Sequence, residues 1–257
     1  NPAAFCGIVG YRPTPGLVPS ERRVMGSSVL PVLGPMARTV ADAALMLGSI
    51  AGDEKLDPLA TTIHGRQVRS ASEFFPPPAV DLSTLRVALT PDFGFAPTER
   101  IVANAFAEKT GLFRHMFARA DDATPDCSGT DEVFEVLRSL VFLAQHGERY
   151  RTKRDQLGPN VVSNIEEGKR YTAEDAARAL QNQTTIYRRW QSFFDSYDVI
   201  LAPAITISPR SWRELYPETI DGKKTRTYFH WLAMAYAVTI VGHPAISLPV
   251  GTDANGM

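Results

Sequence analysis

Short apolar segments alternate with longer amphipathic segments along this 257-residue chain, and the alternation limits the folds open to it. Residues 8–11, 85–89 and 199–201 are short apolar runs typical of buried strands. The segments between them repeat apolar residues three and four positions apart, which is typical of helices with one packed face. Strands and helices in alternation indicate a layered α/β fold.

Capping residues predict where several helices begin. Thr39, with Asp42 three residues later, predicts a helix that ends near Gly52. Thr172 and Asp175 have the same spacing and predict a long helix that extends to about residue 197. The remaining helices are expected after Thr98, from Thr130 and over 228–241, with a loop or extended linker over 66–82.

Composition excludes several classes of protein. The apolar fraction of 44% fits a chain that buries a core, and the net charge of -1 provides no general attraction for nucleic acid. No apolar run is long enough to cross a bilayer, so no membrane partner is expected. The two cysteines indicate no disulfide framework and favour the reducing cytoplasm.

The first ten residues, NPAAFCGIVG, form the most informative motif. Pro2 at a first helical position and Gly7 as a stop predict a very short helix over residues 2–6. Ala3 is small enough to let this turn pack closely, and Cys6 is expected to be buried. A side chain on Gly7 is expected to cause both strain and collision. We therefore expect Pro2, Ala3, Cys6 and Gly7 to support an active site.

Four blocks in order along the chain resemble the amidase signature family of serine hydrolases. They are the opening motif, SVLPVLGPMARTVADAA (28–44), YDVILAPA (197–204) and GHPAISLPVG (242–251). The resemblance implies a mixed central sheet covered on both faces by helices. Residues 53–130 match nothing distinctive, and 238–241 depart from the family pattern, which leaves substrate specificity open.

The resemblance also implies where catalysis takes place. In the family, a Gly-Gly-Ser-x-Arg segment with the nucleophile directly precedes a stretch like residues 1–10, and a second Ser and a Lys complete the catalytic set. All three are expected upstream of Asn1, so none is expected within this chain. The resemblance assigns the pocket walls to the following substrate-binding residues: Leu30, Leu33, Gly34, Gly242, His243, Pro249 and Val250. No cofactor and no metal are expected.

Other features of the sequence have simpler explanations than catalysis. Ser27 and Ser28 follow the motif and lack flanking glycines, so a turn or pocket wall is expected there. His243 and Ser247 have the residue types of a catalytic dyad, but a loop position near the pocket mouth is the favoured interpretation for His243. The basic residues at 149–154 alternate with acidic ones, which favours a solvated helix face over nucleic-acid binding.

The sequence favours a stand-alone amidase that converts a small non-peptide carboxamide to a carboxylate plus ammonia or an amine. The alternatives are the A-type glutaminase subunit of a glutamine-dependent tRNA amidotransferase, and a non-catalytic fragment or pseudoenzyme. Homodimers are common in the family, so self-association is open. Residues 1–257 are expected to form one domain that is the internal or C-terminal part of a larger amidase domain and is incomplete at both ends.

Overall fold

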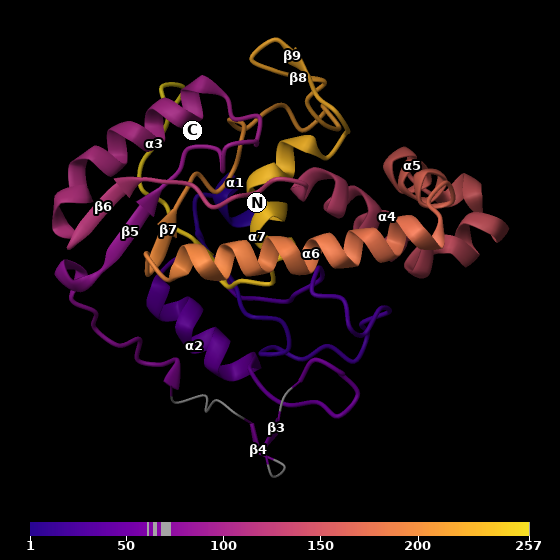
Figure 1. Cartoon of the computed structure of the whole chain (residues 1–257), viewed down its shortest axis with the longest axis horizontal. Helices are drawn as coiled ribbons and strands as arrows, with labels where there is room; N and C mark the ends of the chain where they lie inside the picture. Colours follow the sequence, from indigo (N-terminus) through magenta and orange to yellow (C-terminus); the bar gives the residue numbers. More distant parts are fainter. Residues whose placement is uncertain (61, 64–65, 68–72, 257) are drawn as a thin grey trace.

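The computed structural model describes residues 1–60, 62–63, 66–67 and 73–256 (Figure 1). Its α-helices are α1 (Pro2–Phe5), α2 (Val40–Ile50), α3 (Arg100–Phe113), α4 (Thr130–Thr152), α5 (Pro159–Gly168), α6 (Ala173–Phe194) and α7 (Ala233–Ile240). Its strands are β1 (Val9–Arg12), β2 (Met36–Ala37), β3 (Thr62–Ile63), β4 (Arg66–Gln67), β5 (Arg86–Leu89), β6 (Arg119–Asp122), β7 (Val199–Leu201), β8 (Thr219–Ile220), β9 (Lys223–Lys224) and β10 (Ala245–Ser247). Short 3-10 helices are η2 (Leu82–Thr84), η3 (Arg114–Met116), η4 (Arg154–Gln156) and η5 (His230–Leu232).

Both parallel and antiparallel pairing occur, and the predicted α/β class is confirmed. The parallel sheet has the order β6-β5-β7, with Val87 of β5 opposite Ala120 and Val199. The antiparallel sheet has the order β10-β1-β2, so β1 is its central strand. Strands β3 and β4, and β8 and β9, form two small hairpins.

Helix α4 is the centre of the helical layer. It packs against α5, α6 and α7, and Figure 1 shows α6 running across the molecule in front of α7. A hydrophobic cluster of buried residues joins Phe134 of α4, Trp190 of α6 and Tyr236 of α7. The same cluster includes Phe93 from the loop after β5, so it connects the helices to the parallel sheet.

The predicted helix starts are confirmed at two of the three capping threonines. Thr39 accepts a hydrogen bond from the Asp42 amide, and Thr172 and Asp175 form a capping box. The expected cap at Thr98 is wrong: its hydroxyl donates to the Ala96 carbonyl, and α3 begins at Arg100 without a side-chain cap. Part of the expected linker, residues 68–72, lies outside the described residues.

Candidate functional site

The opening motif forms the predicted short helix and turn. Helix α1 ends at Phe5, and Gly7 has a φ of 61°. The Gly7 amide donates to the Ala4 carbonyl at 3.1 Å, and the next amide, of Ile8, donates to the Ala3 carbonyl at 3.0 Å. An L-residue at this φ is strained, so the turn favours glycine. The chain then reverses directly into β1.

Two expectations about this motif are wrong. Cys6 is exposed, because it caps a four-residue helix at the surface of the described structure. A Cβ on Gly7 meets nothing within 4 Å, so the reason for glycine there is the positive φ alone. The close approach lies at Gly10 instead, where a Cβ would come within 2.4 Å of the Ala3 Cβ. Buried Ala3 is the expected small residue that lets α1 lie on β1.

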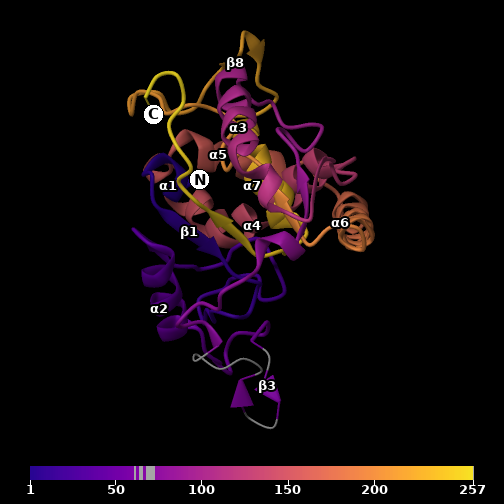
Figure 2. The same cartoon turned by 90° about the vertical axis from the view of Figure 1, so that its left-hand side faces the viewer.

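Three motif segments meet around β1. Helix α1 packs on it, the 242–251 segment pairs with it through β10, and the 28–44 segment pairs with it through β2. Gly34 lies so close to β1 that a Cβ would be 1.9 Å from the Tyr11 carbonyl oxygen. The structure therefore brings together segments that are more than 200 residues apart in sequence (Figure 2).

The predicted substrate-binding residues fall in different environments. Leu30 packs partly buried against the hydrophobic cluster, whereas Leu33 is 57% exposed. Pro249 and Val250 are exposed beyond β10, and Gly242 turns the chain with a φ of 67°. None of these five residues lines either of the two cavities described in the structure.

His243 lies against α6. Its ring stacks with Tyr187 and Trp190 at 5.8 Å each and meets Phe194 edge-on at 5.2 Å. Its Nε2 lies 3.2 Å from Nε2 of Gln191, and burial lowers the pKa of the imidazole. The His243 ring packs against three aromatic side chains, which supports a structural role over a catalytic dyad with Ser247.

Arg12 is a half-buried residue to which the sequence alone assigned no role. Its Nη2 donates to the Val29 carbonyl at 2.8 Å and its Nη1 to the Leu30 carbonyl at 3.2 Å. Burial, and then the nearby Arg23 charge, lower the pKa of Arg12 to about 10. This side chain fixes the backbone at Val29 and Leu30 to the C-terminal end of β1. The only hint of this role in the sequence is the position of Arg12, a charged residue directly after a short apolar run.

A polar cluster lies next to α1 on the side of α7. Phe5 of α1 meets Trp231 of η5 edge-on at 5.9 Å, and Nε2 of the neighbouring His230 is 3.8 Å from the Asp131 carboxylate. Tyr236 donates a hydrogen bond to the same carboxylate. Burial lowers the pKa of His230, although Asp131 partly opposes this effect.

Arg226 joins three carboxylates of α4 in this cluster. Its guanidinium lies 3.5 Å from Asp131, 3.2 Å from Glu132 and 3.0 Å from Glu135. Burial raises the pKa of Glu135 more than Arg226 lowers it. These partners are about 90 residues apart, so no local pattern in the sequence could have predicted the cluster.

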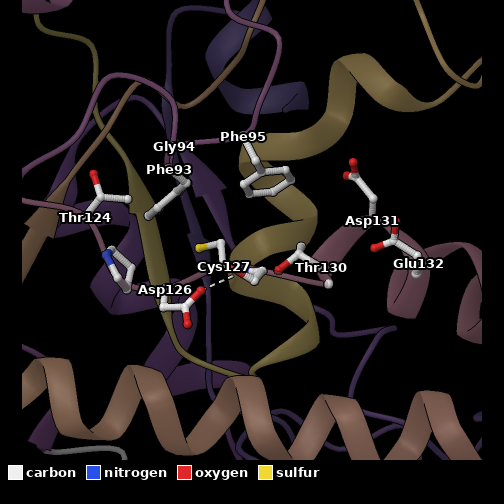
Figure 3. A pocket seen from close by; sticks show the side chains of 12 residues that line it. Phe93, Gly94, Phe95, Thr124, Asp126, Cys127, Thr130, Asp131 and Glu132 are labelled. Carbon is white, nitrogen blue, oxygen red and sulfur yellow. Dashed lines mark hydrogen bonds between the residues drawn. The ribbon is translucent and has the colours of Figure 1, made fainter.

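A cavity of about 390 Å³ opens beside these residues (Figure 3). It lies where the loops after β5 and β6 meet the first turn of α4, at the carboxyl ends of parallel strands where α/β folds bind ligands. Phe93 and Phe95 line one side, and Asp131 lines another. Burial raises the pKa of Cys127 in its wall to about 12, so this thiol is a poor nucleophile.

The described part of the chain holds no group of three or more His, Cys, Asp or Glu side chains placed to bind a metal ion. The basic residues at 149–154 are mostly exposed, and Arg154 pairs with Glu166, as expected for a solvated helix face. Among the helices of the described residues, none is both long and apolar enough to cross a membrane.

Comparison with known proteins identifies the family. The model of the Amidase family matches residues 1–257. The chain belongs to the amidase family. It is 27% identical to an acylamidase of Rhodococcus erythropolis in an alignment of 261 positions that covers 99% of this chain and 53% of that protein. It is 28% identical to the A subunit of the glutamyl-tRNA(Gln) amidotransferase of Desulforudis audaxviator, over 98% of this chain and 54% of that protein.

A solved structure supports the fold of this amidase-family chain. A bacterial aryl acylamidase of the amidase signature family superimposes with a TM-score of 0.80 at 20% identity, covering 98% of this chain and 53% of that one. The chain thus spans about half the length of the relatives it matches.

Proposed function

We propose that the complete protein is an amidase that hydrolyses a small non-peptide carboxamide to a carboxylate and ammonia or an amine. Family membership over residues 1–257 is the observation that supports this proposal most strongly. A seryl nucleophile, a second serine joined by a cis peptide and a lysine base would precede Asn1. In this arrangement a desolvated neutral lysine takes the proton that histidine takes in other serine hydrolases.

The residues of this chain would form the scaffold next to that nucleophile. Helix α1 would lie beneath it, fixed to β1 by the contact between Ala3 and Gly10. The segments that contain Leu30, Leu33 and Gly34, and Gly242 to Val250, would form the floor and walls of the acyl pocket. An oxyanion site from the preceding segment would supply most of the electrostatic stabilisation of the transition state.

Gly7 and Cys6 provide a matched test in the full-length protein. Val at Gly7 must adopt a φ of 61°, so it would shift α1 and is expected to lower kcat about 10²–10³-fold. Ala at the exposed Cys6 is expected to leave kcat unchanged. Rates with aryl and aliphatic amides, with folding checked by circular dichroism, decide the question. Loss of turnover in folded Cys6→Ala with a harmless Gly7→Val would refute the serine-hydrolase proposal.

A second candidate is an amidotransferase A subunit, because one such relative is as similar in sequence as the acylamidase. It predicts that glutamine is the amide consumed and that turnover depends on partner proteins. Hydrolysis of simple amides by the purified full-length protein alone favours the stand-alone amidase, and glutaminase activity that appears only with partners favours the amidotransferase.

The cellular setting is also a proposal. Cys6 and Cys127 are both free, which fits a reducing compartment, and we place the protein in the cytoplasm. Assembly as a homodimer rests on the family resemblance alone, and sedimentation of the full-length protein tests it.

A further inference from the structure

Arg138 is a positively charged side chain enclosed by aromatic rings on α4. Its Cζ lies 4.7 Å from the ring centroid of Phe142 and 5.1 Å from that of Phe229. The Phe134 and Tyr228 rings are both at 5.7 Å. Aromatic faces offset part of the cost of removing a guanidinium from water. They provide no counter-charge that would neutralise it.

The described residues provide Arg138 with no carboxylate within ion-pair distance. Acidic side chains are close along α4, but Asp131, Glu132 and Glu135 pair with Arg226 instead. The hydrogen-bond partners of Arg138 are neutral: its Nε donates to Asn164 Oδ1 at 3.2 Å, and its Nη2 donates to Tyr228 Oη at 2.9 Å. A half-buried charge without a counter-ion is unusual unless a ligand supplies one.

The hydrogen bonds around Arg138 leave donors unused. Tyr228 Oη accepts from both Arg138 and Asn164, so its own hydroxyl hydrogen has no acceptor among these bonds. The two hydrogens of Asn164 Nδ2 go to Tyr228 and to the Asn160 carbonyl at 2.6 Å. The Nη1 group of Arg138 has no hydrogen-bond acceptor within the described structure. Asn164 is fully buried, whereas Arg138 and Tyr228 are partly exposed.

We infer that Arg138 and Tyr228 bind a carboxylate, which we assign to the amide substrate. A carboxylate accepts hydrogen bonds through both oxygens and matches the N–H groups along the edge of a guanidinium. Tyr228 and Phe229 precede η5, whose Trp231 contacts Phe5 of α1. This link along the chain from Tyr228 to the opening motif is the reason for assigning the carboxylate to the substrate. This assignment to the substrate rests on the proposed amidase function, whereas carboxylate binding itself does not.

Direct binding separates the two claims. Benzoate is the probe and acetophenone, which has no hydrolysable amide, is its neutral isostere; both are titrated calorimetrically into the full-length protein. The wild type is expected to bind benzoate more tightly than acetophenone, and Arg138→Gln is expected to weaken benzoate binding about tenfold to hundredfold. Arg178→Gln is the matched control, since Arg178 is an exposed α6 residue that already pairs with Asp175, and it is expected to change nothing.

Two conservative variants keep the test decisive if Arg138→Gln does not fold. Tyr228→Phe removes the hydroxyl and retains the ring, and Arg138→Lys retains the charge without the planar fork. Both are expected to weaken benzoate binding. Wild-type affinity for benzoate in folded Arg138→Gln, or in both conservative variants, would overturn the inference. Equal binding of benzoate and acetophenone by the wild type would overturn it as well.

Turnover then tests the assignment to substrate. The full-length enzyme is expected to prefer 4-acetamidobenzoate over 4-acetamidoacetophenone, a neutral isostere with the same single amide, and Arg138→Gln is expected to abolish that preference by raising KM for the anionic amide. Hydrolysis of neutral amides without any preference for the anion refutes the substrate assignment alone. Benzoate binding through Arg138 in a protein that hydrolyses no amide refutes the proposed function alone.

Discussion

At the scale of single residues, a buried ion pair holds the irregular segment between β1 and β2. The side chains of Arg23 and Asp57 are 2% and 0% exposed, and Nη2 of Arg23 is 3.3 Å from the carboxylate. Arg23 also donates to the Pro31 carbonyl, and the Ser20 amide donates to Asp57 at 2.7 Å. The pair therefore positions the segment around Pro31, which we propose as a pocket wall.

Removing one partner should be costly, because the other charge stays buried. We expect Asp57→Asn to lower the free energy of unfolding by about 3–5 kcal/mol at pH 7, measured by urea denaturation of the full-length protein. Arg22→Gln is the control, since Arg22 is an exposed neighbour, and a change within about 0.5 kcal/mol is expected. An equally small effect of Asp57→Asn would contradict this role.

The same pair predicts a pH dependence. Burial acts to raise the pKa of Asp57, but hydrogen bonds from the Leu59 and Ser20 amides and from Arg23 outweigh it, so the pKa lies below its ordinary value. The stabilisation is therefore complete above the unfolded pKa of about 4 and is lost as the pH falls through the folded pKa. The difference in Tm between wild type and Asp57→Asn should shrink below about pH 4, and a difference that is constant with pH would refute this linkage.

At the scale of elements, the helix starts show what local sequence can predict. The caps at Thr39 and Thr172 were predictable because each depends on a residue three positions away. The start of α3 was not, because the carboxylate of its N-cap residue Glu99 accepts from the Ser208 amide and from Arg210, more than 100 residues distant. The N-cap residue of α3 therefore bonds to residues distant in sequence and makes no side-chain cap within its own helix.

The packing of α4 on α5 provides a matched pair of glycine substitutions. A Cβ on Gly168 of α5 would be 2.7 Å from Leu143 Cδ1 and 3.0 Å from the Ser139 carbonyl oxygen, so Gly168→Ala should destabilise the protein by about 1–3 kcal/mol. A Cβ on Gly147 of α4 meets nothing within 4 Å, and Gly147→Ala should stabilise it by up to about 1 kcal/mol. Shifts of the same sign in chemical denaturation would show that close contact does not explain Gly168.

At the scale of the whole molecule, the motif blocks were predictable and their surroundings were not. The blocks meet around β1 as strands and a short helix, because sheet pairing joins distant segments. The Arg226 cluster and the Arg138 site each combine α4 with residues near α7 across about 90 positions. Neither the Arg226 cluster nor the Arg138 site could be predicted from residue spacing, because their members are far apart in the sequence.

Apolar side chains on and beside β10 are exposed in the described structure, which bears on how residues 1–257 fold. Ile246, Leu248 and Val250 are 47%, 47% and 60% exposed. We expect residues 1–257 produced alone to unfold without a sharp thermal transition and to bind a hydrophobic dye, since exposed apolar surface of this kind is normally covered. A single cooperative transition in calorimetry would show instead that this part is an independent folding unit.

Fluorophosphonate labelling tests the central proposal most directly, since this chain would build the wall and floor of an amidase whose nucleophile precedes Asn1. The complete protein is treated with the fluorophosphonate, digested, and the modified residue is located by mass spectrometry alongside loss of amide hydrolysis. We predict one modified serine preceding Asn1, full loss of turnover, and no modification within residues 1–257. Inactivation through a serine or Cys6 inside residues 1–257, or turnover by this segment alone, would contradict the account.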